Sequence, residues 1–87
     1  EYLPRHARKY ELVEEGVYLM DGRLPISEVN DVLGLSLPAT EYRTLGGMVT
    51  ARLRHLAKEG ESFEDQGCRF TVAKTTDRAV TSVRVER

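Results

Sequence analysis

Hydrophobic positions from Gly60 onward follow a period of two, which is typical of strands with one buried face. Val80 is out of phase with Val83, so we expect either a bulge or a buried strand start there. Short segments rich in turn-forming residues separate the alternating runs. The pattern predicts a three-stranded antiparallel meander, with strands at 62–65, 68–73 and 81–86 and turns at 65–67 and 76–78.

Before Gly60, apolar residues in two segments are spaced three or four apart instead, which predicts two helices. Ser27 is a suitable N-cap for the first helix, and Gly34 suits a left-handed conformation at its C-terminal end. Thr44 is a suitable N-cap for the second helix, which we expect to run to about Ala57. The apolar stripe of this second helix comprises Leu45, Met48, Val49, Leu53 and Leu56.

Three further segments complete the predicted fold. A strand at 17–20 ends in a turn at 21–22 and is expected to join the same sheet as the meander. The segment 35–38 is predicted to be extended, and residues 1–14 to be a linker arm from a preceding domain, because charges of both signs dominate them. We therefore expect an α+β domain at residues 15–87, with a mostly antiparallel sheet of about four strands and two helices on one face.

The composition is that of a single small globular domain. With 87 residues and a formal net charge of −1, the chain offers no strong electrostatic attraction to nucleic acid or acidic lipid. Its one cysteine rules out an internal disulfide and indicates either a reducing compartment or a fold that is indifferent to the redox state. No apolar run approaches the roughly 20 residues that cross a bilayer, so direct membrane insertion is not predicted.

Residue types suited to catalysis or metal binding are sparse. His6 and His55 lie far apart in the sequence and Cys68 is the only thiol, so neither a zinc site nor a thiol nucleophile is predicted. The carboxylates within 59–65 could hold a hard cation weakly, although a solvated acidic hairpin explains them more simply. The sequence contains no evident nucleophile with its base and no phosphate-binding loop. We therefore predict a non-catalytic domain with neither cofactor nor metal.

Gly46, Gly47 and Arg52 are the residues that we single out as candidate contacts for a partner or an anion. The glycines begin the second helix, where free N–H groups could receive an anion, but we favour close packing against another backbone. Arg52 falls inside the apolar stripe of that helix. Its stem can follow the stripe while its guanidinium reaches Glu28, Asp31 or the C-terminal strands, which favours a structural anchor over a ligand contact.

Several short motifs follow one another with regular spacing: a DGRLP run at 21–25, then Val29-Asn30, Leu33-Gly34, Leu37-Pro38, and a TLGG run at 44–47 followed by Arg52-Leu53. In order and spacing they closely resemble the CorC/HlyC transporter-associated domain, over about residues 12–87. The family usually has a Leu-Gly-Arg-Ile-Pro run at the end of its second helix. Residues 53–57 read LRHLA instead, which favours a helix that continues further toward Gly60.

The resemblance implies a function that the residues alone do not. Such domains end membrane proteins of the hemolysin-like or magnesium/cobalt efflux type, which also carry a pair of CBS domains, and they modulate ion transport without carrying the ion. The implied partners are the CBS pair and the membrane domain of the same longer chain, at the cytoplasmic face of the bacterial inner membrane. The implied fold is similar to the second subdomain of PCMH-type FAD-binding proteins.

Two alternatives accompany this interpretation. The chain could be a small-ligand domain that binds flavin or an adenine nucleotide, a possibility that rests on the resemblance in fold. It could also form a homodimer, with apolar residues of the edge strands and of the segment 35–38 at the contact.

Overall fold

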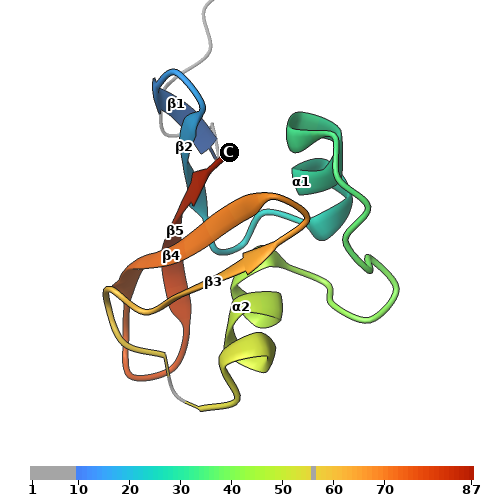
Figure 1. Cartoon of the computed structure of the whole chain (residues 1–87). Coiled ribbons are helices and arrows are strands. Elements are labelled where there is room, and N and C mark those ends of the chain that lie inside the picture. The colour runs from blue at the N-terminus through green and yellow to red at the C-terminus, as the bar shows by residue number, and fades with distance from the viewer. Residues whose placement is uncertain (1–9, 56) are drawn as a thin grey trace, which may run out of the picture.

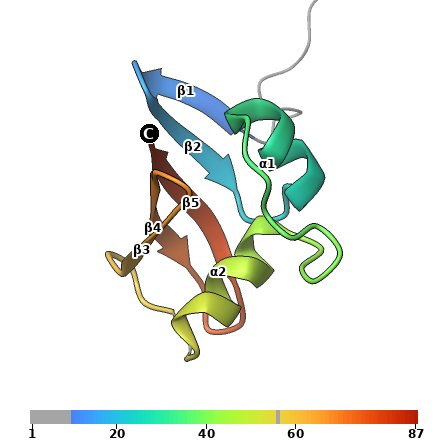
Figure 2. The same cartoon turned by 45° about the vertical axis from the view of Figure 1, so that its right-hand side comes forward.

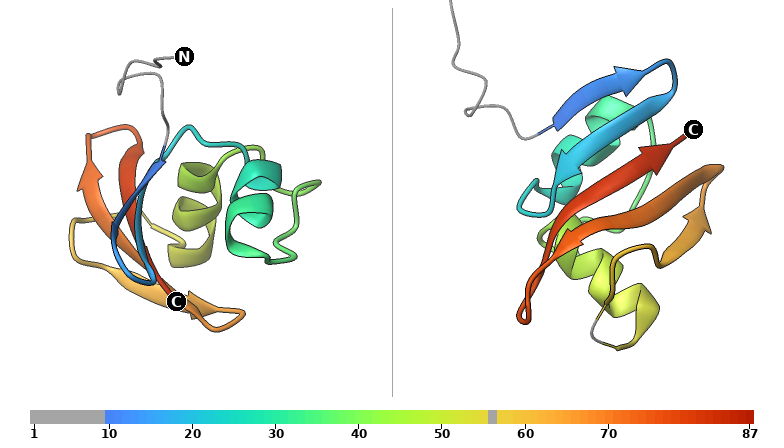
Figure 3. Two further views of the ribbon diagram at one scale, coloured as in Figure 1. Left: turned by 90° about the horizontal axis from the view of Figure 1, so that it is seen from above. Right: turned by 90° about the vertical axis from the view of Figure 1, so that its left-hand side faces the viewer.

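The computed structural model describes residues 10–55 and 57–87 and shows one sheet with two helices packed against it (Figure 1). Neighbouring strands are antiparallel throughout, in the order β1-β2-β5-β4-β3. Both helices lie on the same side of the sheet, as the view from above shows (Figure 3). The predicted α+β class is confirmed, with five strands rather than about four. The elements are β1 (Tyr10–Glu14), β2 (Val17–Asp21), α1 (Ile26–Leu33), α2 (Leu45–Leu53), β3 (Ser62–Asp65), β4 (Cys68–Thr75) and β5 (Val80–Glu86).

The central strands direct their alternate apolar side chains toward the helices. Phe70 on β4 lies opposite Val85 on β5, and Val85 in turn lies opposite Tyr18 on β2. Phe70 and Val85 are completely buried, as expected for the two alternating runs of the predicted meander. The helices complete this core with Ile26, Val29 and Leu33 from α1 and with Leu45, Met48 and Val49 from α2.

The strand at 17–20 joins the same sheet as predicted, because β2 pairs with β5 along its whole length. The fifth strand, β1, was not predicted. We expected residues 1–14 to be a linker arm, but β1 forms at 10–14 by pairing with β2 across a tight turn in which Gly16 has a φ of +79°. All five of its residues are exposed. The sequence of β1 therefore lacks the alternation of buried and exposed residues that marks a half-buried strand, and its charged residues resemble those of a linker. Residues 1–9 lie outside the described part of the chain.

The first helix begins one residue before the predicted cap. Pro25 occupies the N-cap position, and its carbonyl accepts hydrogen bonds from Glu28 and Val29. The early start directs Ile26 into the core, where it is 1% exposed. The predicted end is confirmed, since Gly34 adopts the left-handed conformation and its N–H donates to the Asn30 carbonyl.

The second helix is shorter than predicted. Thr44 caps its start as expected, and α2 packs mainly against β5 (Figure 2). The helix ends at Leu53 because Arg54 turns left-handed, with a φ of +61°, rather than continuing to Ala57. This early end lets the chain turn back toward β3, and Ala57 becomes buried outside the helix. Leu56, expected in the apolar stripe, lies outside the described residues.

Both expectations for Val80 are met in part. Val80 is the first residue of β5 and is 5% exposed, so it is a buried strand start. The register of β5 against β4 also shifts on either side of Lys74, where the partner strand is irregular. Because of this irregularity, Val83 and Val85 lie on the buried face of the sheet, as Val80 does.

A clasp centred on Glu61 closes the connection between α2 and β3. One carboxylate oxygen accepts a hydrogen bond from the Lys58 N–H at 2.8 Å, and the other lies 2.6 Å from His55 Nε2. The Lys58 hydrogen bond, followed by the His55 contact, lowers the pKa of Glu61 below its ordinary value of 4.5. A carboxyl group with a lowered folded-state pKa stabilises the fold above its unfolded pKa and loses that effect as the pH falls.

We therefore expect Glu61→Gln to flatten the dependence of stability on acid pH. Urea unfolding followed by circular dichroism between pH 7 and pH 3 should show the unmodified chain losing stability below about pH 4.5, and the variant losing less. Glu59→Gln, which changes an exposed carboxylate two residues earlier, is the matched control and should keep the original slope. If stability fell equally steeply with pH in all three proteins, the contacts of Glu61 would not contribute to the acid dependence of stability.

Candidate functional site

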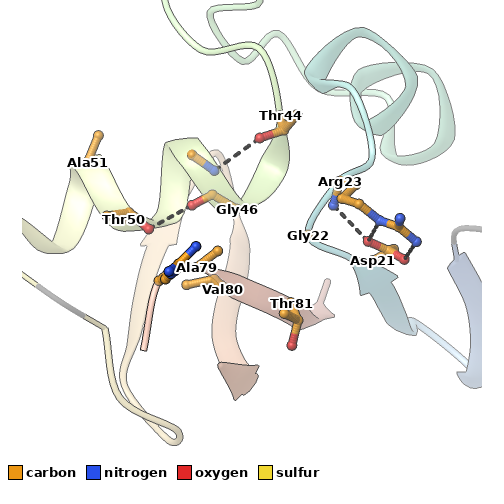
Figure 4. Close-up of a pocket in the computed structure, with 12 residues that line it drawn as sticks. Asp21, Gly22, Arg23, Thr44, Gly46, Thr50, Ala51, Ala79, Val80 and Thr81 are labelled. Atoms are coloured by element: carbon orange, nitrogen blue, oxygen red, sulfur yellow. Dashed lines mark hydrogen bonds and ion pairs between the residues drawn. The ribbon is translucent and has the colours of Figure 1, made fainter. Parts of the chain in front are cut away.

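A pocket of about 800 Å³ is formed where three segments distant in sequence meet. Its walls are the end of β2 with the following turn (21–23), the first turns of α2 with their cap (44–51), and the turn that leads into β5 (78–81) (Figure 4). Its size lies within the range of small-molecule sites, about 300–1,000 Å³. The predicted candidates Gly46 and Gly47 both line this pocket, whereas Arg52 does not.

The backbones of three segments touch at the base of the pocket. A Cβ atom added to Gly22 would lie 2.0 Å from the Val80 carbonyl oxygen, and one added to Gly46 would lie 2.7 Å from the same oxygen. The Gly46 N–H donates to the Gly22 carbonyl at 2.8 Å, and the Gly22 N–H donates to the Thr81 carbonyl at 2.9 Å. Close packing of a glycine against another backbone, which we favoured for this helix start, is therefore found at Gly46.

The N–H groups at the start of α2 are already used within the protein. The Gly47 N–H donates to the Thr44 hydroxyl at 3.2 Å, and the Leu45 N–H donates to the Leu24 carbonyl at 2.9 Å. Together with the Gly46 bond, these contacts satisfy the amides that the anion alternative requires. The amides of Leu45, Gly46 and Gly47 are therefore not available to an anion.

Arg52 binds to the sheet rather than to the pocket. Its guanidinium forms an ion pair with Asp65 on β3 and lies 4.7 Å from the centre of the Phe63 ring. Phe63 in turn stacks on Phe70, with 5.2 Å between the ring centres. The contact fixes the edge strand β3 against α2 and matches the structural anchor that we favoured. The carboxylate comes from the C-terminal strands and not from Glu28 or Asp31.

Two arginines that the sequence analysis did not single out line the pocket. Arg23 follows β2 and forms an ion pair with Asp21, and Arg78 lies in the turn before β5. Asp21 raises the pKa of Arg23 through a hydrogen bond and through its charge. From the sequence, both residues were visible only as parts of turns, at 21–25 and 76–78. Nothing in their spacing shows that the two turns meet in the folded chain.

The remaining candidate residues do not come together. Cys68 is buried in the core, and burial raises the pKa of its thiol, which disfavours the reactive thiolate. In the acidic segment 59–65, two carboxylates already have basic partners from outside the segment: Glu61 pairs with His55 and Glu64 with Arg69. Over residues 10–55 and 57–87, no three His, Cys, Asp or Glu side chains are placed to hold a metal ion. His6 lies outside the described residues.

The fold and the pocket together define a small α+β domain, a five-stranded antiparallel sheet with two helices, of which α2 is tied to the sheet by a glycine contact. The chain belongs to the transporter associated domain family, CorC_HlyC, which it matches over residues 11–87. The similar solved structures include the putative Mg²⁺ and Co²⁺ transporter (CorC) associated region from Neisseria meningitidis. That structure is 26% identical, with a TM-score of 0.87, over 92% of this chain and 99% of the other.

Curated relatives are much longer than this chain. Hemolysin C from Brachyspira hyodysenteriae is 35% identical over 75 residues, which are 85% of this chain and 28% of hemolysin C. UPF0053 protein YhdP from Bacillus subtilis is 31% identical over 75 residues, which are 86% of this chain and 17% of YhdP. The chain therefore spans under a third of the length of either relative. Neither helix within residues 10–55 and 57–87 is long and apolar enough to cross a bilayer.

Proposed function

We propose that this chain is a non-catalytic regulatory module of an ion transporter of the hemolysin-like, magnesium/cobalt efflux type. The observation that carries the proposal is the family match over residues 11–87, supported by a TM-score of 0.87 to the CorC-associated region of N. meningitidis. The relatives' greater length supports a domain that acts on other parts of a longer chain. We place this domain at the cytoplasmic face of the bacterial inner membrane, in a longer chain that also carries a CBS pair and a membrane domain.

The proposed mechanism is a shift between conformations of the transporter. A domain that contacts one conformation better than the other changes their populations by the difference in contact free energy. Gly22, Gly46 and Val80 lock β2, α2 and β5 together, so this part of the domain is suited to move as one rigid body. A rigid body transmits a change in orientation or in bound ligand to whatever it is attached to.

Deleting residues 11–87 from the full-length transporter tests this proposal. We expect the truncated protein to insert into the membrane at normal levels and to show an altered rate of ion efflux, measured with a metal-sensitive dye in loaded vesicles. Insertion is checked separately by membrane fractionation. An unchanged efflux rate at equal insertion would contradict the regulatory role.

The alternatives from the sequence remain predictions with their own tests. A flavin-binding domain would quench or shift flavin fluorescence on titration with the purified chain, and unchanged fluorescence would count against it. The proposed homodimer should give a mass that rises with concentration in sedimentation. Its contact would involve the edge strand β1, where Leu12 is 59% exposed, and segment 35–38, where Leu37 is buried but Leu35 is half-buried and Pro38 exposed.

A further inference from the structure

The edge of the sheet at β1 is uncovered within residues 10–55 and 57–87. β2 pairs with β1 on its inner side, and no described strand pairs with its outer side (Figure 3). The large apolar side chains that the described chain exposes all belong to this strand: Tyr10 is 40%, Val13 45% and Leu12 59% exposed. An edge strand of this kind can accept a further strand through its backbone.

The hydrogen bonds between β2 and β5 determine which backbone groups of β1 point outward. In this antiparallel pair the Gly22 N–H donates to the Thr81 carbonyl, and the Arg87 N–H donates to the Gly16 carbonyl, at 2.9 Å each. Successive residues of a strand direct their backbone groups alternately to its two sides. The even-numbered residues of β2 therefore bond to β5, and the odd-numbered residues face β1.

The outward groups of β1 belong to Tyr10 and Leu12. Leu19 of β2 lies opposite Glu11, so the backbone groups of Glu11 are directed into the sheet. The backbone groups of Tyr10 and Leu12 point to the outer edge, where no described residue bonds to them. Each of these two residues offers one N–H donor and one carbonyl acceptor, in the spacing that an added strand requires.

The side chains of β1 are divided between the two faces of the sheet. Tyr10 lies opposite the buried Met20, so Tyr10 and Leu12 lie on the side that the helices cover. Glu11 and Glu14 lie on the other side, opposite odd-numbered residues of β2. A strand that adds at this edge therefore meets apolar groups on one face and carboxylates on the other.

The charge along this edge is negative. The strand and the turn after it contain three exposed glutamates, at positions 11, 14 and 15, and no lysine or arginine. Arg84 on β5 lies 3.4 Å from Glu14, but Glu86 shares it at 3.6 Å. A second copy of β1 would bring the same glutamates toward each other, which opposes pairing between copies. The edge therefore fits a strand in which apolar and basic residues alternate.

We propose that the β1 edge binds an extended segment of alternating basic and apolar residues from the cytoplasmic side of the transporter's membrane domain. This inference rests on the proposed function, which supplies the membrane domain as the neighbour. Cytoplasmic loops of membrane proteins carry an excess of lysine and arginine, which matches the negative edge. Backbone hydrogen bonds to Tyr10 and Leu12 provide affinity, and the two faces of β1 provide specificity. Docking here fixes the orientation of the domain beside the membrane.

A synthetic strand tests the edge directly on the 87-residue chain. The probe is the peptide acetyl-RVKLRVK-amide, and its control has glutamate at every basic position. In nuclear magnetic resonance of the ¹⁵N-labelled chain, we expect saturable shifts with the basic peptide alone. The amides of Tyr10 and Leu12 should gain protection against hydrogen exchange, because they acquire partners, whereas the inward Glu11 amide should not change. Shifts without this alternating protection would show general attraction of charge and would overturn the proposal.

Matched variants separate the edge from the overall charge of the chain. Leu12→Ser should weaken peptide binding about tenfold, because an exposed leucine is no longer available for burial. Glu14→Gln combined with Glu15→Gln should also weaken it, most clearly at low ionic strength. Glu59→Gln combined with Glu64→Gln removes the same charge near the opposite edge strand, β3, and should leave binding unchanged. All five side chains are exposed, so the variants should fold normally, which circular dichroism checks. Equal weakening by both double variants would contradict a docking site at β1.

Sedimentation of the chain alone tests the competing occupant. We expect a mass that does not rise with concentration at neutral pH, because the glutamates of two copies repel each other. A dimer that Leu12→Ser abolishes would assign the edge to a second copy and would overturn the proposal.

Ion efflux by the full-length transporter distinguishes this inference from the regulatory role. We expect Leu12→Ser with Glu14→Gln and Glu15→Gln to alter efflux in the same direction as deletion of residues 11–87. If the deletion alters efflux and the β1 variant does not, the regulatory role stands and the docking site is wrong. Unchanged efflux after the deletion would contradict the regulatory role itself, whatever the peptide experiment shows.

Discussion

Gly22→Ala is expected to remove most of the stability of this domain. The new methyl group would lie 2.0 Å from the Val80 carbonyl oxygen and 3.0 Å from the carbonyl carbon, and neither backbone atom can move away alone. Relief requires β2 and β5 to separate at this point, which breaks the Gly22–Thr81 hydrogen bond of 2.9 Å. We expect a loss of about 3 kcal/mol or more, against a typical total of about 5 kcal/mol for a small domain. Urea unfolding followed by circular dichroism measures this loss.

Gly47→Ala is the matched control for this prediction. Gly47 lines the same pocket, but a Cβ atom there meets only the Thr44 hydroxyl, at 3.3 Å. The helix preference for alanine favours the change, so we expect the stability to stay within about 1 kcal/mol of the original. If Gly22→Ala unfolded at the same urea concentration as Gly47→Ala, the close backbone contact at Val80 would be disproved.

Asn30→Asp should cause the second large loss, although the two side chains have nearly the same shape. The Asn30 amide donates to the Leu37 carbonyl at 3.0 Å and accepts from the Leu37 N–H at 2.8 Å, which fixes the segment after α1. An aspartate carboxylate still accepts from the Leu37 N–H, but its other, negatively charged oxygen faces the Leu37 carbonyl oxygen. We expect a loss of about 2–3 kcal/mol at pH 7, measured by urea unfolding.

The pH dependence of the Asn30→Asp variant distinguishes this cause from a general loss of packing. A protonated carboxyl group can again donate to the Leu37 carbonyl, so the pKa of the new side chain should be raised in the folded state. The loss of stability should therefore shrink as the pH falls through that raised pKa. Asp31→Asn, at the exposed neighbouring position, is the control and should change stability by no more than about 0.5 kcal/mol. A deficit that stays constant with pH would refute the hydrogen-bond explanation.

Much of the fold could be predicted because local chemistry and tertiary structure agree. Thr44 and Gly34 mark helix ends in the sequence and do so in the structure, and the period of two in β4 and β5 marks their buried faces. The predictions failed where contacts between residues distant in sequence determine the local structure. β1 is a strand because β2 offers it a partner, and α2 ends at Leu53 because the chain must return to β3.

The site was harder to predict for the same reason. Gly46 was singled out because two adjacent glycines begin the second helix, and the structure shows the close backbone packing that we favoured for them at Gly46. Arg23 and Arg78 gave no comparable signal, since isolated arginines in turns are common and only the packing of 21–23 beside 78–81 places them in one pocket. The partner of Arg52 was predicted only as a set of alternatives, of which the C-terminal strands were correct.

The meeting of Gly22, Gly46 and Val80 also bears on how the chain folds. These residues are separated by 24 and 34 positions, so their contacts close long loops and cost chain entropy before any energy is gained. Neither half of the chain can build the junction by itself, because β2 comes from the first half and α2 and β5 from the second. We therefore expect a single all-or-none transition with no stable fragment, and a nascent chain that stays unfolded until Val80 has been synthesised.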